Sequence, residues 1–117
     1  MKKALITIFC LVFAAGALWG ARPRKQDTPV AVTVYAKGEG GYDTFRIPAI
    51  VQIPCGDILA FAEARKNGAG DTGDIDLVMK RSRDGGRSWS GFSVIWDDGG
   101  NVCGNPSPVV DCRSGKI

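Results

Sequence analysis

Histidine is absent from this sequence of 117 residues. Its absence excludes an imidazole base or nucleophile on this chain and removes the commonest side-chain ligand of catalytic zinc. Cysteine is scarce as well. Beyond the first 20 residues only Cys55, Cys103 and Cys112 occur, and no two of them have the spacing of a zinc site. We therefore expect no metal and no cofactor. Three thiols leave one unpaired, and a Cys103–Cys112 disulfide is one of several open pairings.

A strong excess of charge is also missing. The formal net charge is +3, and Lys2 and Lys3 lie in a segment that we expect to be removed, so the remainder is close to neutral. A nucleic-acid-binding domain carries a basic patch or stripe, which this composition does not provide. We expect no nucleic-acid partner.

Long apolar stretches are absent except at the N-terminus, where two lysines precede an apolar run from Ala4 to Trp19. A basic start, an apolar run and small residues after it are the layout of a secretory signal peptide. The alternative is a membrane anchor, for which the run is short. We predict a signal peptide over residues 1–20, helical from Ala4 to Trp19, a linker over 21–29 and a folded domain over 30–117. The product would be exported, to the periplasm or outside the cell, without stable membrane insertion.

The apolar runs after residue 29 are short and are separated by glycine-rich turns. Alternating apolar residues, β-branched side chains and turn signals favour antiparallel strands, and no stretch keeps a helical period. The predicted strands are 30–36, 47–53, 58–64, 76–82, 92–97 and 107–112. The sequence therefore predicts an all-β fold of antiparallel hairpins. Because unpaired strand edges need neighbours, we expect a fragment of a larger β architecture.

One turn has a specific pattern, "SRDGGRSW", which fits Ser-x-Asp-x-Gly-x-(Ser/Thr)-Trp. Its fixed positions are Ser82, Asp84, Gly86, Ser88 and Trp89. An aspartate can accept hydrogen bonds from the backbone of its own turn, a glycine can take a positive φ, and the tryptophan can pack beneath. The pattern predicts a structural hairpin turn. A calcium loop is disfavoured because the alternating oxygen ligands and the distal Glu are missing.

Together with "YDTFRIPAIV" upstream, this turn resembles the Asp-box of bacterial exo-α-sialidases, over roughly residues 30–112. The resemblance implies a six-bladed β-propeller of which this chain forms the first one to two blades. It also implies hydrolysis of terminal α-linked sialic acids from glycoproteins, glycolipids or oligosaccharides. Two alternatives stay open, a trans-sialidase and a non-catalytic Asp-box propeller that binds glycan or protein.

The resemblance assigns roles to three charged residues. Arg46 and Arg65 match two of the three arginines that bind the sialic acid carboxylate, and a guanidinium offers the planar paired donors that such a group requires. Asp71 matches the acid/base aspartate, with Asp74 and Asp76 as rivals in the same loop. From the residues alone, Arg46 has a second reading, a salt bridge with an acidic neighbour.

Further residues complete the expected site. Strand alternation places Glu63 beside Arg65, where it would orient the guanidinium. The resemblance also includes Ile47 and Asn105 among the substrate-binding residues. The family's nucleophilic Tyr, its Glu partner and the third Arg are expected beyond residue 117, so the chain should not catalyse alone.

Overall fold

A computed structural model describes residues 30–117, and the predicted signal peptide, its helix and the linker lie outside this range. The described part is all-β. It contains the strands β1 (Thr44–Gln52), β2 (Ile58–Arg65), β3 (Ile75–Ser82) and β4 (Ser93–Trp96), and a single short 3-10 turn, η1 (Glu39–Gly41). Among residues 30–117 no helix has the length and hydropathy of a membrane span.

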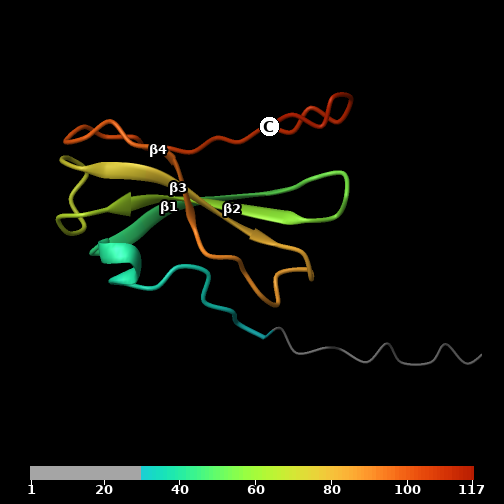
Figure 1. Cartoon of the computed structure of the whole chain (residues 1–117), viewed down its shortest axis with the longest axis horizontal. Helices are drawn as coiled ribbons and strands as arrows, with labels where there is room; N and C mark the ends of the chain where they lie inside the picture. Colours follow the sequence, from blue (N-terminus) through green and yellow to red (C-terminus); the bar gives the residue numbers. More distant parts are fainter. Residues whose placement is uncertain (1–29) are drawn as a thin grey trace, which may run out of the picture.

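The four strands form one antiparallel sheet in the order β1-β2-β3-β4, so each strand pairs with its neighbour in sequence (Figure 1). Both predicted hairpins are confirmed: one joins β1 to β2, and the other joins β3 to β4 around residues 82–89. A four-stranded meander of this kind is the unit from which β-propellers are built, and the fold is consistent with part of a sialidase propeller.

Two of the predicted strands are wrong. Residues 30–36 form no strand, although the segment is rich in β-branched residues. Tyr35 instead stacks on Phe45, with ring centroids 5.0 Å apart, and its hydroxyl donates to the Ala60 carbonyl (2.7 Å). The segment is therefore attached to the face of the sheet through a side chain and not through a backbone ladder. Strand propensity depends on such context.

Residues 107–112 also form no strand. Pro106 and Pro108 have no N–H to donate to a ladder. Asp111 is engaged in a turn of its own, accepting a hydrogen bond from the Arg113 backbone N (2.9 Å). The strand ends differ as well, because β1 begins three residues before the predicted 47–53 and β4 is shorter than the predicted 92–97.

The central strand β2 is buried on both faces. One face carries Ala60, Ala62 and Ala64, each at most 2% exposed. Small side chains let a thick aromatic layer lie directly on this face. That layer consists of Tyr35, Tyr42, Phe45 and Phe92, which contact one another edge-on or stacked. Burial of this layer holds the segment before β1 against the sheet.

The segment after β4 pairs with Ile75, the first residue of β3. Cys103 N donates to the Ile75 carbonyl (2.7 Å), and Val102 forms an isolated parallel bridge with the same residue. In Figure 1 this segment runs along one side of the sheet, and the segment with η1 lies along the other. Cys55, Cys103 and Cys112 are all free thiols.

The aromatic layer yields a stability prediction through Gly40, whose φ is +62° and where a Cβ would lie 2.3 Å from the Phe92 ring. Gly41 is the matched control, since its φ is +88° but a Cβ there would meet nothing within 4 Å. Both alanine variants carry the cost of a positive φ, whereas only Gly40→Ala must also displace Phe92. We expect Gly40→Ala to lower the free energy of unfolding by about 1–3 kcal/mol more than Gly41→Ala. Urea unfolding measures the difference, and equal losses would contradict this packing.

Candidate functional site

Arg46 projects from an irregular point in β1. In the register with β2, Arg46 pairs with Glu63 and Ala49 pairs with Phe61. Ile47 and Pro48 therefore lie together opposite a single residue of β2. This is a β-bulge, a feature that re-aims neighbouring side chains. Ile47 has a φ of +52°, which is strained for a β-branched residue. Strain of this kind is concentrated at functional sites.

Arg65, at the end of β2, is almost completely buried and is paired with Glu63 on the same face. Their side chains are 3% and 4% exposed. Arg65 Nε donates to Glu63 Oε2 (3.1 Å), and a second bond runs to the same oxygen from Arg65 Nη2. Arg65 Nη1 donates to the carbonyls of Ala69 (2.7 Å) and Gly70 (2.6 Å). These bonds fix the guanidinium and fold the following loop around it. Glu63 thus lies beside Arg65 on the same face of β2.

Asp71 lies where the two arginines meet. A single oxygen, Oδ1, accepts hydrogen bonds from Arg46 Nη1 (2.9 Å) and Arg65 Nη1 (2.8 Å). The side chain is nevertheless 78% exposed, so the cluster opens to solvent. Hydrogen bonding to Arg65, with the charge of Arg46, holds the pKa of Asp71 below its usual value. In the free chain Asp71 is therefore ionised at neutral pH.

The two rival aspartates lie elsewhere. Asp74 contacts Lys66, with Lys66 Nζ 2.8 Å from Asp74 Oδ1. Asp76 accepts a hydrogen bond from the Tyr42 hydroxyl (2.5 Å) and also faces Lys66 Nζ (3.2 Å). Of the three aspartates, only Asp71 contacts the arginines in residues 30–117.

Asn105 reaches the cluster from the segment after β4. Its backbone N donates to Glu63 Oε1 (2.8 Å), and its φ is +54°. The approach is close, because a Cβ on Gly104 would lie 2.5 Å from the same Glu63 oxygen. Gly104 is therefore required by the tight fit of this segment against Glu63.

These residues surround one pocket of about 250 Å³. Its lining consists of Arg46, Ile47, Glu63, Arg65, Asp71, Val102 and Asn105. Six of the seven are residues that the sequence predicts for the site. Val102 was missed, since it comes from a segment with no charged or motif residue and reaches the pocket only through its pairing with Ile75. Both non-glycine residues with positive φ in the described part of the chain, Ile47 and Asn105, line this pocket.

The 82–89 turn lies at the opposite end of the sheet, as the antiparallel register requires, because Ser82 pairs with the first residue of β2. Asp84 Oδ1 accepts bonds from Ser82 Oγ (2.8 Å) and Ser88 N (2.9 Å), and its Oδ2 accepts one from Ser88 Oγ (2.6 Å). Gly86 has a φ of +88°, and Trp89 Nε1 donates to its carbonyl (3.2 Å). All the fixed positions of the motif thus have structural roles inside the turn.

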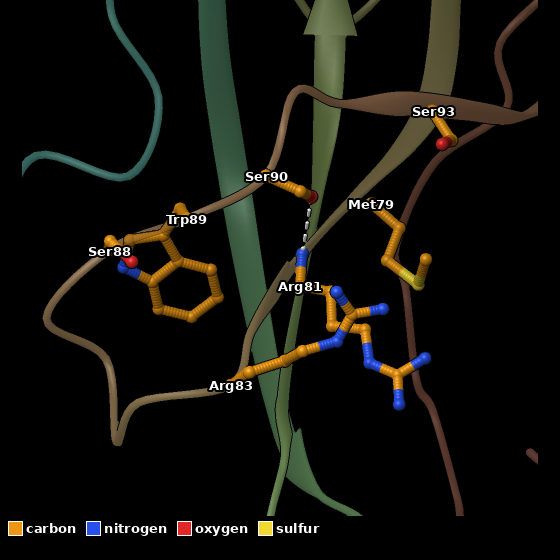
Figure 2. Close-up of a pocket in the computed structure, with 7 residues that line it drawn as sticks. All are labelled: Met79, Arg81, Arg83, Ser88, Trp89, Ser90 and Ser93. Atoms are coloured by element: carbon orange, nitrogen blue, oxygen red, sulfur yellow. Dashed lines mark hydrogen bonds between the residues drawn. The ribbon is translucent and has the colours of Figure 1, made fainter.

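A second pocket, of about 490 Å³, lies beside this turn. Figure 2 shows its lining, with the hydrogen bond from the Arg81 backbone N to Ser90 Oγ (3.0 Å) that closes the turn. The pocket has two arginines, and both face Asp57. Arg81 is paired with Asp57 Oδ2, at 2.6 Å from Nε and 2.5 Å from Nη2, and Arg83 Nε lies 3.9 Å from the same oxygen. The convergent arginines at the other end of the sheet are therefore the better candidate site.

Comparisons with curated proteins return sialidases. No family model matches the chain. Curated relatives include the exo-alpha-sialidases of Aspergillus fumigatus and Arthroderma benhamiae, 44% and 42% identical over 61% of this chain. The sialidase of Micromonospora viridifaciens is 32% identical over 84% of the chain. These matches cover 19%, 19% and 15% of the relatives, so the chain spans about a fifth of their length or less.

The buried pair yields a second stability prediction, with Glu63→Gln as the test and Asp71→Asn as its control. Each variant removes one carboxylate charge from Arg65, but the Glu63 side chain is 4% exposed and that of Asp71 is 78% exposed. We expect Glu63→Gln to lower the free energy of unfolding on the order of 3 kcal/mol, because it leaves a buried guanidinium without its main partner. Asp71→Asn should cost less than about 1 kcal/mol. Equilibrium unfolding followed by tryptophan fluorescence measures both, and similar losses would show that Glu63 is not the main partner of Arg65.

Proposed function

Because the chain belongs to the sialidase family, we propose that it forms part of an exo-α-sialidase, an enzyme that removes terminal α-linked sialic acids from glycoproteins, glycolipids or oligosaccharides. One observation carries the proposal: Arg46 and Arg65 converge on a single carboxylate oxygen at the mouth of an open pocket. A sialic acid carries a carboxylate on its anomeric carbon, and two fixed guanidiniums are suited to bind that group.

Asp71 occupies the place that the substrate carboxylate would take. Binding of the substrate to both arginines removes the hydrogen bonds that keep the pKa of Asp71 low, and it brings a second negative charge close by. Both changes raise the pKa of Asp71. The displaced aspartate then takes up a proton beside the glycosidic oxygen, as a general acid requires. This replacement of the Asp71 carboxylate by the substrate carboxylate, the carboxylate exchange, thus both binds the substrate and protonates the acid.

The remaining groups of the site have supporting roles. Glu63 holds Arg65 and, through the Asn105 backbone N, the segment that carries Asn105. Asn105 is left to hydrogen-bond a substituent of the sugar, and Ile47 forms an apolar part of the wall.

The nucleophile of the reaction is assigned to no residue of this chain. In the family a Tyr activated by a Glu takes this role, since a carboxylate nucleophile would be repelled by the substrate carboxylate. Tyr35 and Tyr42 do not fit: their hydroxyls donate to the Ala60 carbonyl and to Asp76, and neither residue lines the pocket. We expect the chain alone to bind sialic acid without hydrolysing a sialoside.

Export completes the proposal. The apolar run after Lys2 and Lys3 would direct the chain out of the cytoplasm, where sialylated glycoconjugates are encountered. The structural turn at Asp84 would serve as an Asp-box, far from the pocket.

The experiment for the function replaces the matched segment of the Micromonospora viridifaciens sialidase with residues 30–117. We expect the graft to hydrolyse sialosides, and Asp71→Ala to lower kcat far more on a natural sugar leaving group than on an activated phenol, which needs little protonation. Equal factors for Asp71→Ala on the two substrates would remove Asp71 as the acid.

Arg46→Lys should raise KM on both substrates, because lysine keeps the charge but loses the paired donors. A graft that folds and binds sialic acid but turns over neither substrate would favour a binding propeller.

The carboxylate exchange predicts proton uptake on binding. Asp71 has a lowered pKa in the free chain because of its contacts with Arg65 and Arg46, so it stays ionised in mildly acidic solution and regains a proton when the ligand displaces it from these two residues. Calorimetric titration with free sialic acid at about pH 5, in buffers of different ionisation enthalpy, should show uptake of part of a proton by the chain. Asp71→Asn should bind without this uptake, and the methyl ester of sialic acid should bind weakly. Proton-independent binding by the unmodified chain would rule out the exchange.

A further inference from the structure

A second group of carboxylates lies at the same end of the sheet as the arginine pocket. In the described part of the chain, oxygens of Asp74, Asp76 and Asp97 lie within 4.8 Å of one another. Asp74 directly precedes β3 and Asp76 is the second residue of the strand, so their spacing of two places them on one face. Asp97 directly follows β4, whose last residue, Trp96, pairs with Leu77. Strand pairing thus brings together three acids from distant parts of the sequence.

Asp76 is the unusual member of this group. It is 0% exposed, and its Oδ2 is occupied by the Tyr42 hydroxyl (2.5 Å) and Lys66 Nζ (3.2 Å). Its Oδ1 is buried and accepts no hydrogen bond from any residue between 30 and 117. A buried carboxylate oxygen without a partner is costly and needs explanation.

The charge of the group is also incompletely balanced. Within residues 30–117, Lys66 is the cationic side chain that forms ion pairs here, with Asp74 (2.8 Å) and Asp76 (3.2 Å). Asp97 forms no ion pair with any described residue, and its Oδ1 accepts only the Gly99 backbone N (2.8 Å). The group therefore contains three carboxylates, one of them fully buried, and one ammonium that pairs with two of them.

We propose that Asp74, Asp76 and Asp97 bind a divalent cation, Ca²⁺ by preference. The donors are all carboxylate oxygens, which select hard cations, and the set has no thiolate or imidazole to favour zinc. Ligand atoms up to 4.8 Å apart fit around one ion with Ca–O bonds of about 2.4 Å. No motif spacing in the sequence indicates this site. The proposal departs from the expectation of no metal because of the geometry around Asp76.

Lys66 holds the place of the cation in the free chain. Its side chain is 36% exposed, and Nζ lies 5.8 Å from the centroid of the Tyr42 ring, so the ammonium has room to move outward into solvent. Bound Ca²⁺ would join the end of the 66–74 loop to the turn after β4. That loop carries Asp71 and wraps Arg65, so the ion would order one wall of the pocket. The site stands whether or not the chain acts on sialic acids.

The test is calorimetric titration of the chelator-treated chain with CaCl₂. We expect one saturable site, with a Kd between about 10 µM and 1 mM. Asp97→Asn should weaken binding at least about tenfold, because it removes a carboxylate ligand and leaves Asp74 and Asp76 in place. Asp98→Asn is the matched control, since it removes the same charge from the next residue, whose Oδ2 accepts a hydrogen bond from Asn101 Nδ2 (3.0 Å); its Kd should stay within about twofold.

Lys66→Gln gives an independent readout in the opposite direction. Removal of the competing ammonium should tighten Ca²⁺ binding several-fold, whereas a purely structural ion pair predicts a less stable chain with no gain in affinity. The absence of saturable binding up to about 10 mM Ca²⁺ would overturn the proposal, and so would equal effects of Asp97→Asn and Asp98→Asn. Weaker Ca²⁺ binding by Lys66→Gln would overturn it as well.

Discussion

The ion pair between Glu63 and Arg65 is the contact on which the rest of this structure depends. Two charges that are 3% and 4% exposed must recover the cost of leaving water, and a single pair does so only when its other donors and acceptors are satisfied. Here they are. The second Glu63 oxygen accepts the Asn105 backbone N, and Arg65 donates to two carbonyls of the following loop.

Satisfying this pair organises three separate segments. The loop after β2 closes around the guanidinium, the segment after β4 comes close enough that residue 104 must be glycine, and the pocket forms between them. A buried ion pair is weak evidence for high stability. Here the pair sets the positions of the neighbouring segments, because their hydrogen bonds to Glu63 and Arg65 form only when each segment lies in one place. The exposed Arg46 and Asp71 then join a framework that is already fixed.

Much of the fold could be predicted because its determinants are local. Alternation and turn residues define β2 and β3, and the glycine-rich 82–89 turn joins β3 to β4 at the expected place. The failure at residues 30–36 has a non-local cause. Residues 30–36 have strand-like composition, yet Tyr35 packs on the alanine face of β2, so the backbone of this segment does not pair with the edge of the sheet. The failure at residues 107–112 has a local cause, because Pro106 before the segment and Pro108 within it have no backbone N–H to donate.

The identities of the site residues could be predicted from the motifs, whereas their geometry could not. The sequence indicates Arg46, Arg65 and Asp71, but nothing in it shows that one aspartate oxygen bridges both arginines. The contact between Glu63 and Asn105 joins residues 42 positions apart, and only the folded chain reveals it. The acidic group around Asp76 was missed for the same reason, since Asp97 reaches it through the pairing of β3 with β4.

The bulge at Ile47 and Pro48 has a consequence for how the protein avoids self-association. β1 is an edge strand of the sheet, and a regular edge strand offers a continuous row of donors and acceptors to which another chain can add. In β1 that row is interrupted, because Ile47 has a reversed φ and Pro48 has no N–H. The residues that aim Arg46 into the pocket thus also interrupt the template for aggregation. Selection for solubility and selection for a ligand site would act on the same two residues, and a change that straightened β1 would harm both.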